Sequence, residues 1–358
     1  MNRLIRAVID TRALRHNLRT IRERANGARV MAVVKANAYG HGLIPTALAL
    51  AEADAFAVAR LEEGLALRAA GITQPIVLLE GVFAAEHLLE AARHGFDLVV
   101  HDPLQIELLE EYSGASRFLV WMKIDTGMNR LGFRPEDFPA ALARIQRMRP
   151  AALEIRLLTH LARADESDDT MTREQLGRFQ EATQGLDYSV SIANTAGLFG
   201  SVHLQQDWVR PGLALYGASP FEDKTAAQMG LHPVMSLETS VIAIRKVKAG
   251  ETVGYGGTWR ASHDSTIAII AAGYGDGITR NLAGGTPILV NGQRAPVVGR
   301  VSMDMIAVDV THTQGVHVGT PVVLWGVGLP VEEIARYAAT IPYELLCGVS
   351  QRVPLELR

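Results

Sequence analysis

Residues 30–42 read VMAVVKANAYGHG, a short apolar run that ends directly in a lysine, an asparagine and a glycine-rich turn. Apolar runs of about four to eight residues are typical of strands buried in a parallel sheet. Similar runs recur along the chain, separated by amphipathic stretches with helical period. Eight such strands at even spacing favour a (β/α)8 TIM-like barrel, although a doubly wound open sheet would give the same alternation. The runs after the first cover residues 55–59, 76–79, 98–100, 118–124, 153–159, 188–192 and 208–216.

The pattern changes after about residue 231, where strand-like segments follow one another with Gly or Asn turns between them. The Asn291-Gly292 pair between two apolar runs predicts a tight hairpin. A single short helix is evident, over residues 331–338. The sequence therefore predicts an α/β protein with two domains, a barrel over residues 1–231 and a mainly-β domain over residues 232–358.

Composition narrows the functional class. The chain has 358 residues, a formal net charge of −3, 48% hydrophobic and 20% charged residues. The near-neutral charge argues against a nucleic-acid partner. The one cysteine, Cys347, excludes an intrachain disulfide and a cysteine-rich metal site. With no signal-like apolar stretch at the start and no run long enough to cross a bilayer, the expectation is a soluble cytoplasmic protein without a membrane partner.

The chain contains only five lysines, against 30 arginines. Lys35 directly follows the apolar run quoted above, which would bring it to the mouth of the barrel. Partial desolvation there would favour the free amine, a nucleophile toward carbonyl groups. A solvated lysine at a strand end remains the alternative.

Other strand ends also carry polar groups. Lys123 ends the fifth run, His160 follows the sixth, Asn194-Thr195 follow the seventh and Arg210 lies in the eighth. In a barrel these ends share one face, where active sites lie. Asn194-Thr195 would suit a phosphate at a helix N-terminus, although an ordinary helix cap fits equally. A lone His160 is more often a core histidine.

Several longer motifs in both halves of the chain resemble those of the alanine racemase family. They occur in the family's order and span essentially the whole chain: VVKANAYGHG, KIDTGMNRLGF, THLARADE, WVRPGLALYG, VGYGGTW, AAGYGDG, VGRVSMDM and PYELLC. The resemblance implies pyridoxal 5'-phosphate as cofactor, interconversion of L- and D-alanine, and a homodimer with shared active sites. Taken from the residues alone, the Tyr-Gly motifs of the second domain could equally be hairpin turns.

By this resemblance, Lys35 binds the cofactor as a Schiff base and serves as the base on one face of the substrate. Tyr255 of the other subunit serves on the opposite face, in a hydrogen-bonded chain with His160 and Arg210. Arg210 also faces the pyridine nitrogen and, because arginine holds its proton, leaves that nitrogen unprotonated. Tyr274 and Tyr343 resemble entrance residues that keep the pocket small.

The resemblance also assigns the binding sets. Arg130 contacts the cofactor and the substrate carboxylate, and Met303 of the second subunit binds that carboxylate through its backbone. Lys123 matches a lysine that is carbamylated in some members, with an unmodified lysine paired to Asp125 or to a solvent anion as the alternative. No metal is expected. The full cofactor-binding set is Lys35, Tyr39, Arg130, His160, Asn194, Thr195, Arg210, Gly212, Leu213 and Tyr343, and the substrate-binding set is Arg130, Met303 and Tyr255.

Three other functions compete with alanine racemisation. A pyridoxal-phosphate-binding barrel that manages cofactor supply would resemble a single domain, which the second domain argues against. A two-domain amino-acid decarboxylase of the same broad fold would resemble a longer chain. A metal-dependent barrel hydrolase using His41, His160 and His203 lacks a His pair at ligand spacing. The sequence leaves open whether D-alanine is made for peptidoglycan or consumed in catabolism.

Overall fold

The structure, a computed structural model, describes residues 4–148 and 153–358. Its larger part is a closed barrel in which each strand pairs in parallel with the next and β2 also pairs with β9. The predicted (β/α)8 barrel is therefore confirmed, and the open-sheet alternative is wrong. The strands are β2 (Arg29–Val33), β3 (Ala55–Val58), β4 (Ile76–Leu78), β5 (Phe96–Val100), β6 (Phe118–Lys123), β7 (Leu153–Leu158), β8 (Val190–Ser191) and β9 (Trp208–Val209).

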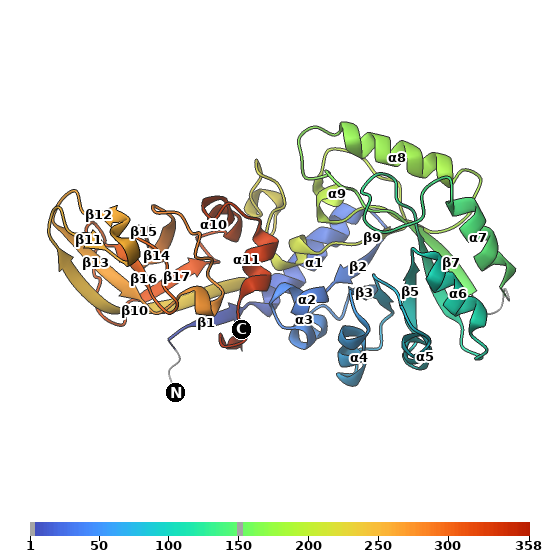
Figure 1. Cartoon of the computed structure of the whole chain (residues 1–358), viewed down its shortest axis with the longest axis horizontal. Coiled ribbons are helices and arrows are strands. Elements are labelled where there is room, and N and C mark those ends of the chain that lie inside the picture. The colour runs from blue at the N-terminus through green and yellow to red at the C-terminus, as the bar shows by residue number, and fades with distance from the viewer. Residues whose placement is uncertain (1–3, 149–152) are drawn as a thin grey trace.

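Helices follow the barrel strands and cover the outside of the barrel (Figure 1). The last apolar run, residues 208–216, forms a strand only at β9, because Pro211 lacks a backbone N–H for a sheet ladder. Its remainder forms the 3-10 helix η2 (Leu213–Tyr216). The helices are α2 (Lys35–Tyr39), α3 (Leu43–Ala49), α4 (Leu61–Ala69), α5 (Ala85–His94), α6 (Pro103–Glu111), α7 (Phe138–Arg147), α8 (Thr170–Ala182) and α9 (Thr195–Phe199).

The second part is a twisted eight-stranded sheet in the order β13-β16-β15-β14-β17-β10-β1-β18, in which β13 also pairs with β10. The predicted hairpin at Asn291-Gly292 is present, because Val290 pairs with Gln293 and both turn residues have positive φ. Two helices pack on this sheet, one more than the sequence predicted. The elements are β10 (Met235–Val247), β13 (Ser265–Ile270), β14 (Pro287–Val290), β15 (Gln293–Val298), β16 (Ile306–Asp309), β17 (Pro321–Trp325), α10 (Val331–Tyr337), α11 (Pro342–Gly348) and β18 (Leu355–Leu357).

The first strand of the chain, β1 (Arg6–Ile9), does not join the barrel. It lies antiparallel to β10 and parallel to β18, inside the sheet of the second part. The helix α1 (Thr11–Ala25) then leads to the barrel and begins at Asp10, whose carboxylate accepts two backbone N–H groups of the first turn. The barrel domain expected over residues 1–231 thus contributes its first strand to the other sheet. Residues 1–3 and 149–152 of that range lie outside the described residues.

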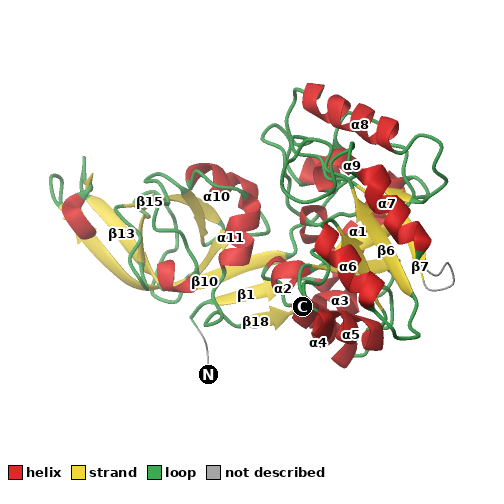
Figure 2. Cartoon of the chain, turned by 45° about the vertical axis from the view of Figure 1, so that its right-hand side comes forward, coloured by secondary structure: helices red, strands yellow, loops and turns green. Residues whose placement is uncertain are grey.

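The two parts lie side by side, with α10 and α11 on the side of the β sheet that faces the barrel (Figure 1, Figure 2). The approach is close at Gly40, just after α2, where a Cβ atom would lie 2.2 Å from the carbonyl oxygen of Leu346 in α11. Only glycine is tolerated at such a contact. No helix in the described part of the chain has the length and apolar character needed to cross a membrane.

Candidate active site

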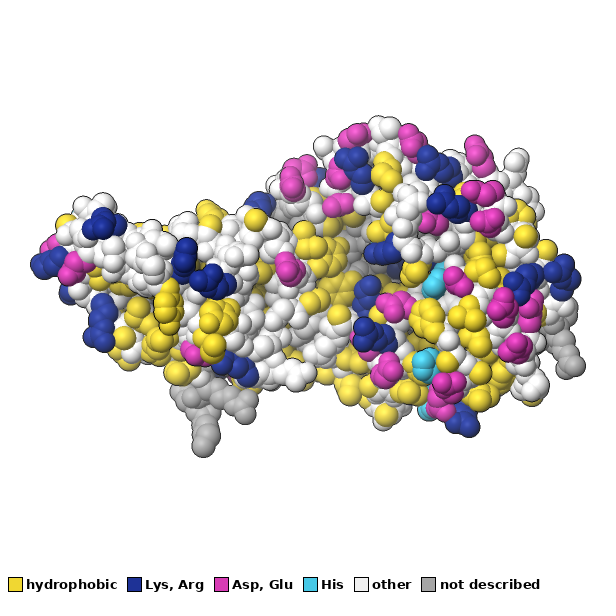
Figure 3. All heavy atoms as spheres, in the orientation of Figure 1, with side chains coloured by type: hydrophobic (Ala, Val, Ile, Leu, Met, Phe, Trp, Pro, Cys, Tyr) yellow, Lys and Arg dark blue, Asp and Glu magenta, His cyan; other side chains and the backbone are white. Residues whose placement is uncertain are grey.

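Polar side chains from five barrel strands meet at one mouth of the barrel. Lys35 follows β2, Lys123 ends β6, His160 follows β7, Asn194 follows β8 and Arg210 follows β9. All five are therefore at the carboxyl ends of parallel strands, the active-site face of this fold. Figure 3 shows a hollow between the barrel and the β domain, with Lys or Arg side chains along its barrel side.

Lys35 begins a left-handed turn. Four consecutive residues after it, residues 36–39, have φ between 52° and 54°. For non-glycine residues this conformation costs about 1–2 kcal/mol each. Such strain persists only where surrounding contacts fix it, and it is concentrated at functional sites. Because of this turn, one short segment presents both Lys35 and Tyr39 at the mouth of the barrel.

Contacts from three sides hold the left-handed turn. Glu63 accepts the Ala36 backbone N–H at 2.7 Å, and the Asn37 side chain accepts the Leu43 N–H at 2.9 Å. The buried His41 donates from Nδ1 to the carbonyls of residues 38 and 39, at 3.0 and 2.9 Å. Because carbonyls only accept, the proton is on Nδ1. Burial lowers the pKa of His41 to about 4, so its ring is neutral.

A small cradle of neutral donors lies beside this turn. The Thr195 hydroxyl accepts the backbone N–H groups of Gly212 and Ala214, at 3.1 and 3.2 Å. A Cβ at Gly212 would lie 2.3 Å from the Tyr39 hydroxyl, so glycine alone allows this approach. The cradle thus joins the turn after β2 to the loops after β8 and β9.

Two further groups complete the cradle. Leu213 begins η2, and the first N–H groups of a helix have no partner within it. The ring of Tyr343, on α11, is tilted against that of Tyr39 with 5.8 Å between centroids. Burial raises the pKa of Tyr343 to about 12, so its hydroxyl keeps its proton and can donate. The β domain thereby adds a residue to the mouth of its own barrel.

Arg210 is the most buried cation of the mouth, 4% exposed. Its guanidinium donates to the Ser191 hydroxyl at 2.6 Å, the Thr159 carbonyl at 2.6 Å and the Ile192 carbonyl at 3.2 Å. All three acceptors are neutral. Desolvation lowers the pKa of Arg210 to about 10, so it remains charged at neutral pH without a carboxylate in its hydrogen-bond set.

His160 lies among these positive charges. Burial and then the charges of Arg210, Lys123, Arg130 and Lys35 lower its pKa to about 2, so the imidazole is neutral. The Asn194 amide is 3.5 Å from its Nε2 atom. Within the described residues Arg210 does not hydrogen-bond to His160, so the chain implied by the resemblance is not formed inside one subunit.

Lys123 is 8% exposed and unusually easy to deprotonate. Burial and the nearby charges of Arg130 and Arg210 lower its pKa to about 8. It makes no ion pair with a described carboxylate. The Asp125 carboxylate instead accepts the N–H groups of Gly127 and Asn129 at 3.0 Å, which shapes the loop carrying Arg130. Within the described residues Lys123 and Asp125 form no ion pair within 4.0 Å, although the charge of Asp125 still acts on Lys123.

Tyr255 does not reach this mouth within one chain, and Met303 is exposed in a loop of the β domain. Tyr255 is in η4 (Tyr255–Gly257), which joins β11 (Thr252–Val253) to β12 (Trp259–Arg260). That ribbon lies at the end of the β domain farthest from the barrel (Figure 1). Tyr255 is 69% and Met303 53% exposed. The structure thus brings together one set of predicted site residues at the mouth and leaves Tyr255 at the far end of the β domain.

Some residues that shape the site were not identified from sequence. Ser191 and Thr159 accept from Arg210, and Glu63 and His41 hold the turn beside Lys35. His41 is inside the quoted AYGHG motif, which was the available signal. Nothing marks Glu63, a helix-start glutamate like any other. The described residues hold no cluster of three or more His, Cys, Asp or Glu side chains arranged for a metal ion.

Both parts of the chain match models of a known protein family. The family model described as alanine racemase, N-terminal domain, matches residues 9–220, and that described as alanine racemase, C-terminal domain, matches residues 234–357. The chain is 51% identical to an alanine racemase of Nitrosococcus oceani over 349 residues, 97% of this chain and 98% of that one. It is 49% identical to the biosynthetic alanine racemase of Escherichia coli over 350 residues, 98% of both.

Solved structures agree. The biosynthetic alanine racemase of Pseudomonas aeruginosa superposes with a TM-score of 0.96 at 43% identity, covering 99% of each chain. The alanine racemase of Bacillus anthracis with bound L-Ala-P gives a TM-score of 0.86 at 33% identity, covering 100% of this chain and 96% of that one. The likeness extends over both the barrel and the β domain.

Proposed function

The chain belongs to the alanine racemase family and interconverts L-alanine and D-alanine, and on that premise we propose that it uses pyridoxal 5'-phosphate and two bases from different subunits of a homodimer. The family assignment decides against the cofactor-supply barrel, the decarboxylase and the metal-dependent hydrolase. The relatives named biosynthetic favour a role in supplying D-alanine. The cytoplasmic location remains a prediction.

The residues at the barrel mouth fit this cofactor. A phosphate needs several donors, and the cradle offers the Thr195, Tyr39 and Tyr343 hydroxyls with the backbone N–H of Leu213. The Gly212 N–H, which donates to the Thr195 hydroxyl in this structure, would turn to the phosphate when it binds. The space that a Cβ at Gly212 would close is the space beside the Tyr39 hydroxyl. Lys35 and Arg130 border the same mouth, together with His160, Asn194 and Arg210. When bound, the cofactor would supply an aldehyde that condenses with the substrate amino group and a conjugated pyridine ring that withdraws electrons from Cα.

The single observation that carries this proposal is the position of Lys35. It is the first residue of a strained turn that also carries Tyr39, at the carboxyl end of a barrel strand. Its amine can therefore link to a carbonyl group and, once released, hold or remove a proton on one face of Cα. The contacts that hold the turn also fix the backbone from which the Lys35 amine extends, beside the phosphate cradle.

Racemisation requires a second base on the opposite face. We assign it to Tyr255 of the partner subunit, because Tyr255 is exposed and remote from its own barrel. A tyrosine acts as a base only where its anion is stabilised, since its ordinary pKa is about 10. Arg210 supplies a fixed positive charge at the mouth. The neutral His160 ring can accept a hydrogen bond from one group and donate to another.

Arg210 has a second part in the proposal. It holds its own proton at neutral pH and faces only neutral acceptors in this structure. A group of this kind at the pyridine nitrogen does not protonate it, which limits electron withdrawal and disfavours side reactions such as transamination. Arg130 and the backbone of Met303 of the partner subunit would hold the substrate carboxylate.

Lys123 is proposed to be carbamylated. Its lowered pKa of about 8 leaves more free amine at neutral pH than an ordinary lysine has, and the free amine is the form that adds to carbon dioxide. The resulting anion would lie among Arg130, Arg210 and Lys35, where a negative charge is stabilised. A mass increase of one carbamate on the folded enzyme, lost on acidification and absent from Lys123→Arg, would support this assignment.

Borohydride trapping tests the central assignment. The purified enzyme should absorb visible light, and reduction should fix the cofactor on one lysine, identified by peptide mass mapping. We expect the adduct on Lys35, because it is the lysine of the strained turn beside the cradle. An adduct on Lys123 or another lysine would refute the proposal. The Lys224→Arg enzyme, altered at a remote lysine, is the matched control and should be labelled like the parent.

A further inference from the structure

Two neighbouring loops of the β domain carry exposed apolar side chains. One contains η5 (Tyr274–Asp276) after β13, and the other, residues 302–305, precedes β16. Their backbones are joined, because the Tyr274 N–H donates to the Ser302 carbonyl at 3.0 Å and the Gly275 N–H donates to the Met303 carbonyl at 2.8 Å. Tyr274 is 41% exposed. Any movement of one loop therefore displaces the other.

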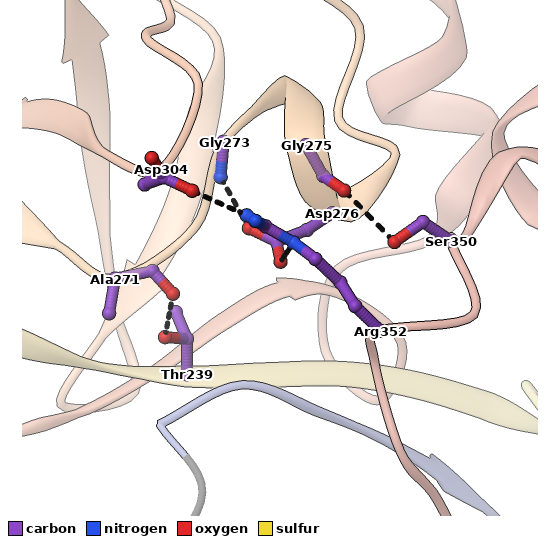
Figure 4. Close-up of polar contacts among 8 residues, drawn as sticks. All are labelled: Thr239, Ala271, Gly273, Gly275, Asp276, Asp304, Ser350 and Arg352. Carbon is purple, nitrogen blue, oxygen red and sulfur yellow. Dashed lines mark hydrogen bonds and ion pairs between the residues drawn. The ribbon is translucent and has the colours of Figure 1, made fainter.

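A single guanidinium ties these loops to a third segment. Arg352 donates from Nε to Asp276 and from Nη2 to Asp304, each at 2.7 Å (Figure 4). The second carboxylate oxygen of Asp276 accepts the Gly273 N–H at 2.9 Å. We call Arg352, Asp276 and Asp304 the Arg352 clamp. It joins both loops to the segment that leads into β18.

The same segment makes two further bonds to the η5 loop. The Ser350 N–H donates to the Asp276 carbonyl at 3.0 Å. The Ser350 hydroxyl donates to the Gly275 carbonyl at 2.9 Å, as Figure 4 shows. Beyond Arg352, β18 pairs with β1 in the main sheet. The segment that carries Arg352 is thus anchored in the main sheet, and the clamp holds the two loops to it.

Burial and charge make the clamp more than a surface ion pair. The Asp276 side chain is 5% exposed, whereas those of Arg352 and Asp304 are about half exposed, 47% and 57%. Exposed ion pairs contribute little, but removing the partner of a buried carboxylate leaves an uncompensated charge. Hydrogen bonds to both carboxylates raise the pKa of Arg352 further. Two carboxylates in different directions suit the planar fork of arginine and not a lysine ammonium.

We propose that Arg352 is a positioning residue for racemisation: its clamp fixes the Met303 backbone and the Tyr274 ring in the geometry that holds the substrate carboxylate and limits side-chain size. The inference rests on the proposed function, in which Met303 enters the partner subunit's site, and on the resemblance of Tyr274 to a residue that lines the entrance of such a site. Arg352 itself acts only through the loops.

The test measures kinetics and selectivity in the holoenzyme variants R352M, R352K and D304A. The Michaelis constant and turnover number are measured for alanine, and kcat/KM is measured for serine relative to alanine. Circular dichroism and thermal unfolding record folding. The control is R294M, which breaks another Arg–carboxylate pair of the same domain, Arg294 with Glu333, away from both loops.

We expect R352M to raise KM for alanine by roughly tenfold while kcat changes less than about threefold, because ground-state positioning is lost. The serine-to-alanine ratio should rise by roughly three- to fivefold as the Tyr274 ring loosens. D304A should shift both quantities the same way, and its effect should not add to that of R352M. R352K, with one point charge, should lie between R352M and the parent, and R294M should match the parent.

Two results would overturn the proposal. One is an R352M enzyme of lowered thermal stability whose KM and selectivity equal those of the parent, which makes Arg352 only a structural residue. If R352M does not fold, R352K and D304A decide in the same way. The other is full additivity of R352M and D304A. Failure of the proposed function is distinguishable, because it would show as unimpaired racemisation in Tyr255→Phe, whatever the Arg352 variants do.

Discussion

Lys35, Lys123, Arg130 and Arg210 bring four cationic side chains to one barrel mouth, and none of them forms an ion pair with a described carboxylate within 4.0 Å. Like charges this close are unfavourable unless anions join them. A phosphate and a substrate carboxylate are anions of that kind. The electrostatics of the mouth therefore favour the loaded enzyme over the empty one.

The sequence predicted which residues lie in the site, but it did not predict the hydrogen-bond partners and charges that surround them. Lys35, His160 and Arg210 could be predicted because each follows an apolar run, and strand ends meet at one face. The neutral acceptors of Arg210 could not, since Ser191 and the carbonyls of Thr159 and Ile192 reach it only when β7, β8 and β9 pair side by side. The neutral state of His160 could not be predicted either, because it depends on burial and on charges from three other loops.

Replacing Tyr255 by Phe tests the second base. The variant removes one hydroxyl that is exposed in a single chain, so folding should be unaffected. We expect exchange of the α-deuterium to slow by roughly 10²- to 10⁴-fold for one enantiomer of alanine and much less for the other, the usual contribution of a general base. Tyr337→Phe, at another exposed tyrosine of the same domain, should leave both rates unchanged. Equal losses for L- and D-alanine would contradict the two-base assignment.

Among the elements, the left-handed turn after β2 was the least predictable. Alanine is a strong helix former, and nothing in the local sequence signals positive φ at Ala36 or Ala38. Tertiary contacts from Glu63 and His41 impose it. By contrast, the Asn291-Gly292 hairpin followed from local sequence, because both residues tolerate the conformation that the turn requires. Elements fixed by their own residues were predictable, and those fixed by distant contacts were not.

The cradle between η2 and the left-handed turn can be tested by Gly212→Ala. The added methyl group would meet the Tyr39 hydroxyl at 2.3 Å and move it from the cradle. We expect the dissociation constant for pyridoxal phosphate to rise by roughly tenfold or more, read from cofactor absorbance on titration of the apoenzyme.

Gly177→Ala is the matched control for this change. Gly177 is inside α8 with no atom within 4 Å of the added methyl, so alanine should be neutral or slightly stabilising there. Cofactor affinity equal to the parent in the Gly212 variant would show that the cradle does not hold the phosphate.

The whole molecule is elongated, with Lys35 in the barrel and Tyr255 at the far end of the β domain. A site that needs both residues is incomplete in one chain. Two copies related by a two-fold axis would exchange their β domains' contributions, which is an isologous arrangement. The two-domain pattern of the sequence agrees with sites shared between two copies. The physical reason for such sharing is the distance in space between Lys35 and Tyr255 of one chain.

Mixed dimers test this arrangement directly. A Lys35→Ala chain paired with a Tyr255→Phe chain, isolated through two different affinity tags, has one intact site of two if sites are shared. We therefore expect about half the parental activity per dimer, although each homodimer is inactive. A chain carrying both substitutions, paired with a parental chain, should be inactive. The reverse result, with activity only in the second pair, would show that each chain builds its own site.

The placement of β1 has a consequence for how the chain is made. Arg6 in this strand pairs with Glu238, 232 residues later, and its other neighbour, β18, comes later still. During synthesis the barrel can close before β1 has a partner, because the two strands that flank β1 have not yet left the ribosome. Connectivity therefore sets the order of assembly. The barrel forms first, and the sheet that contains β1 forms after it. A nascent chain stalled before β10 would present an unpaired strand edge, the surface that chaperones and aggregation both recognise.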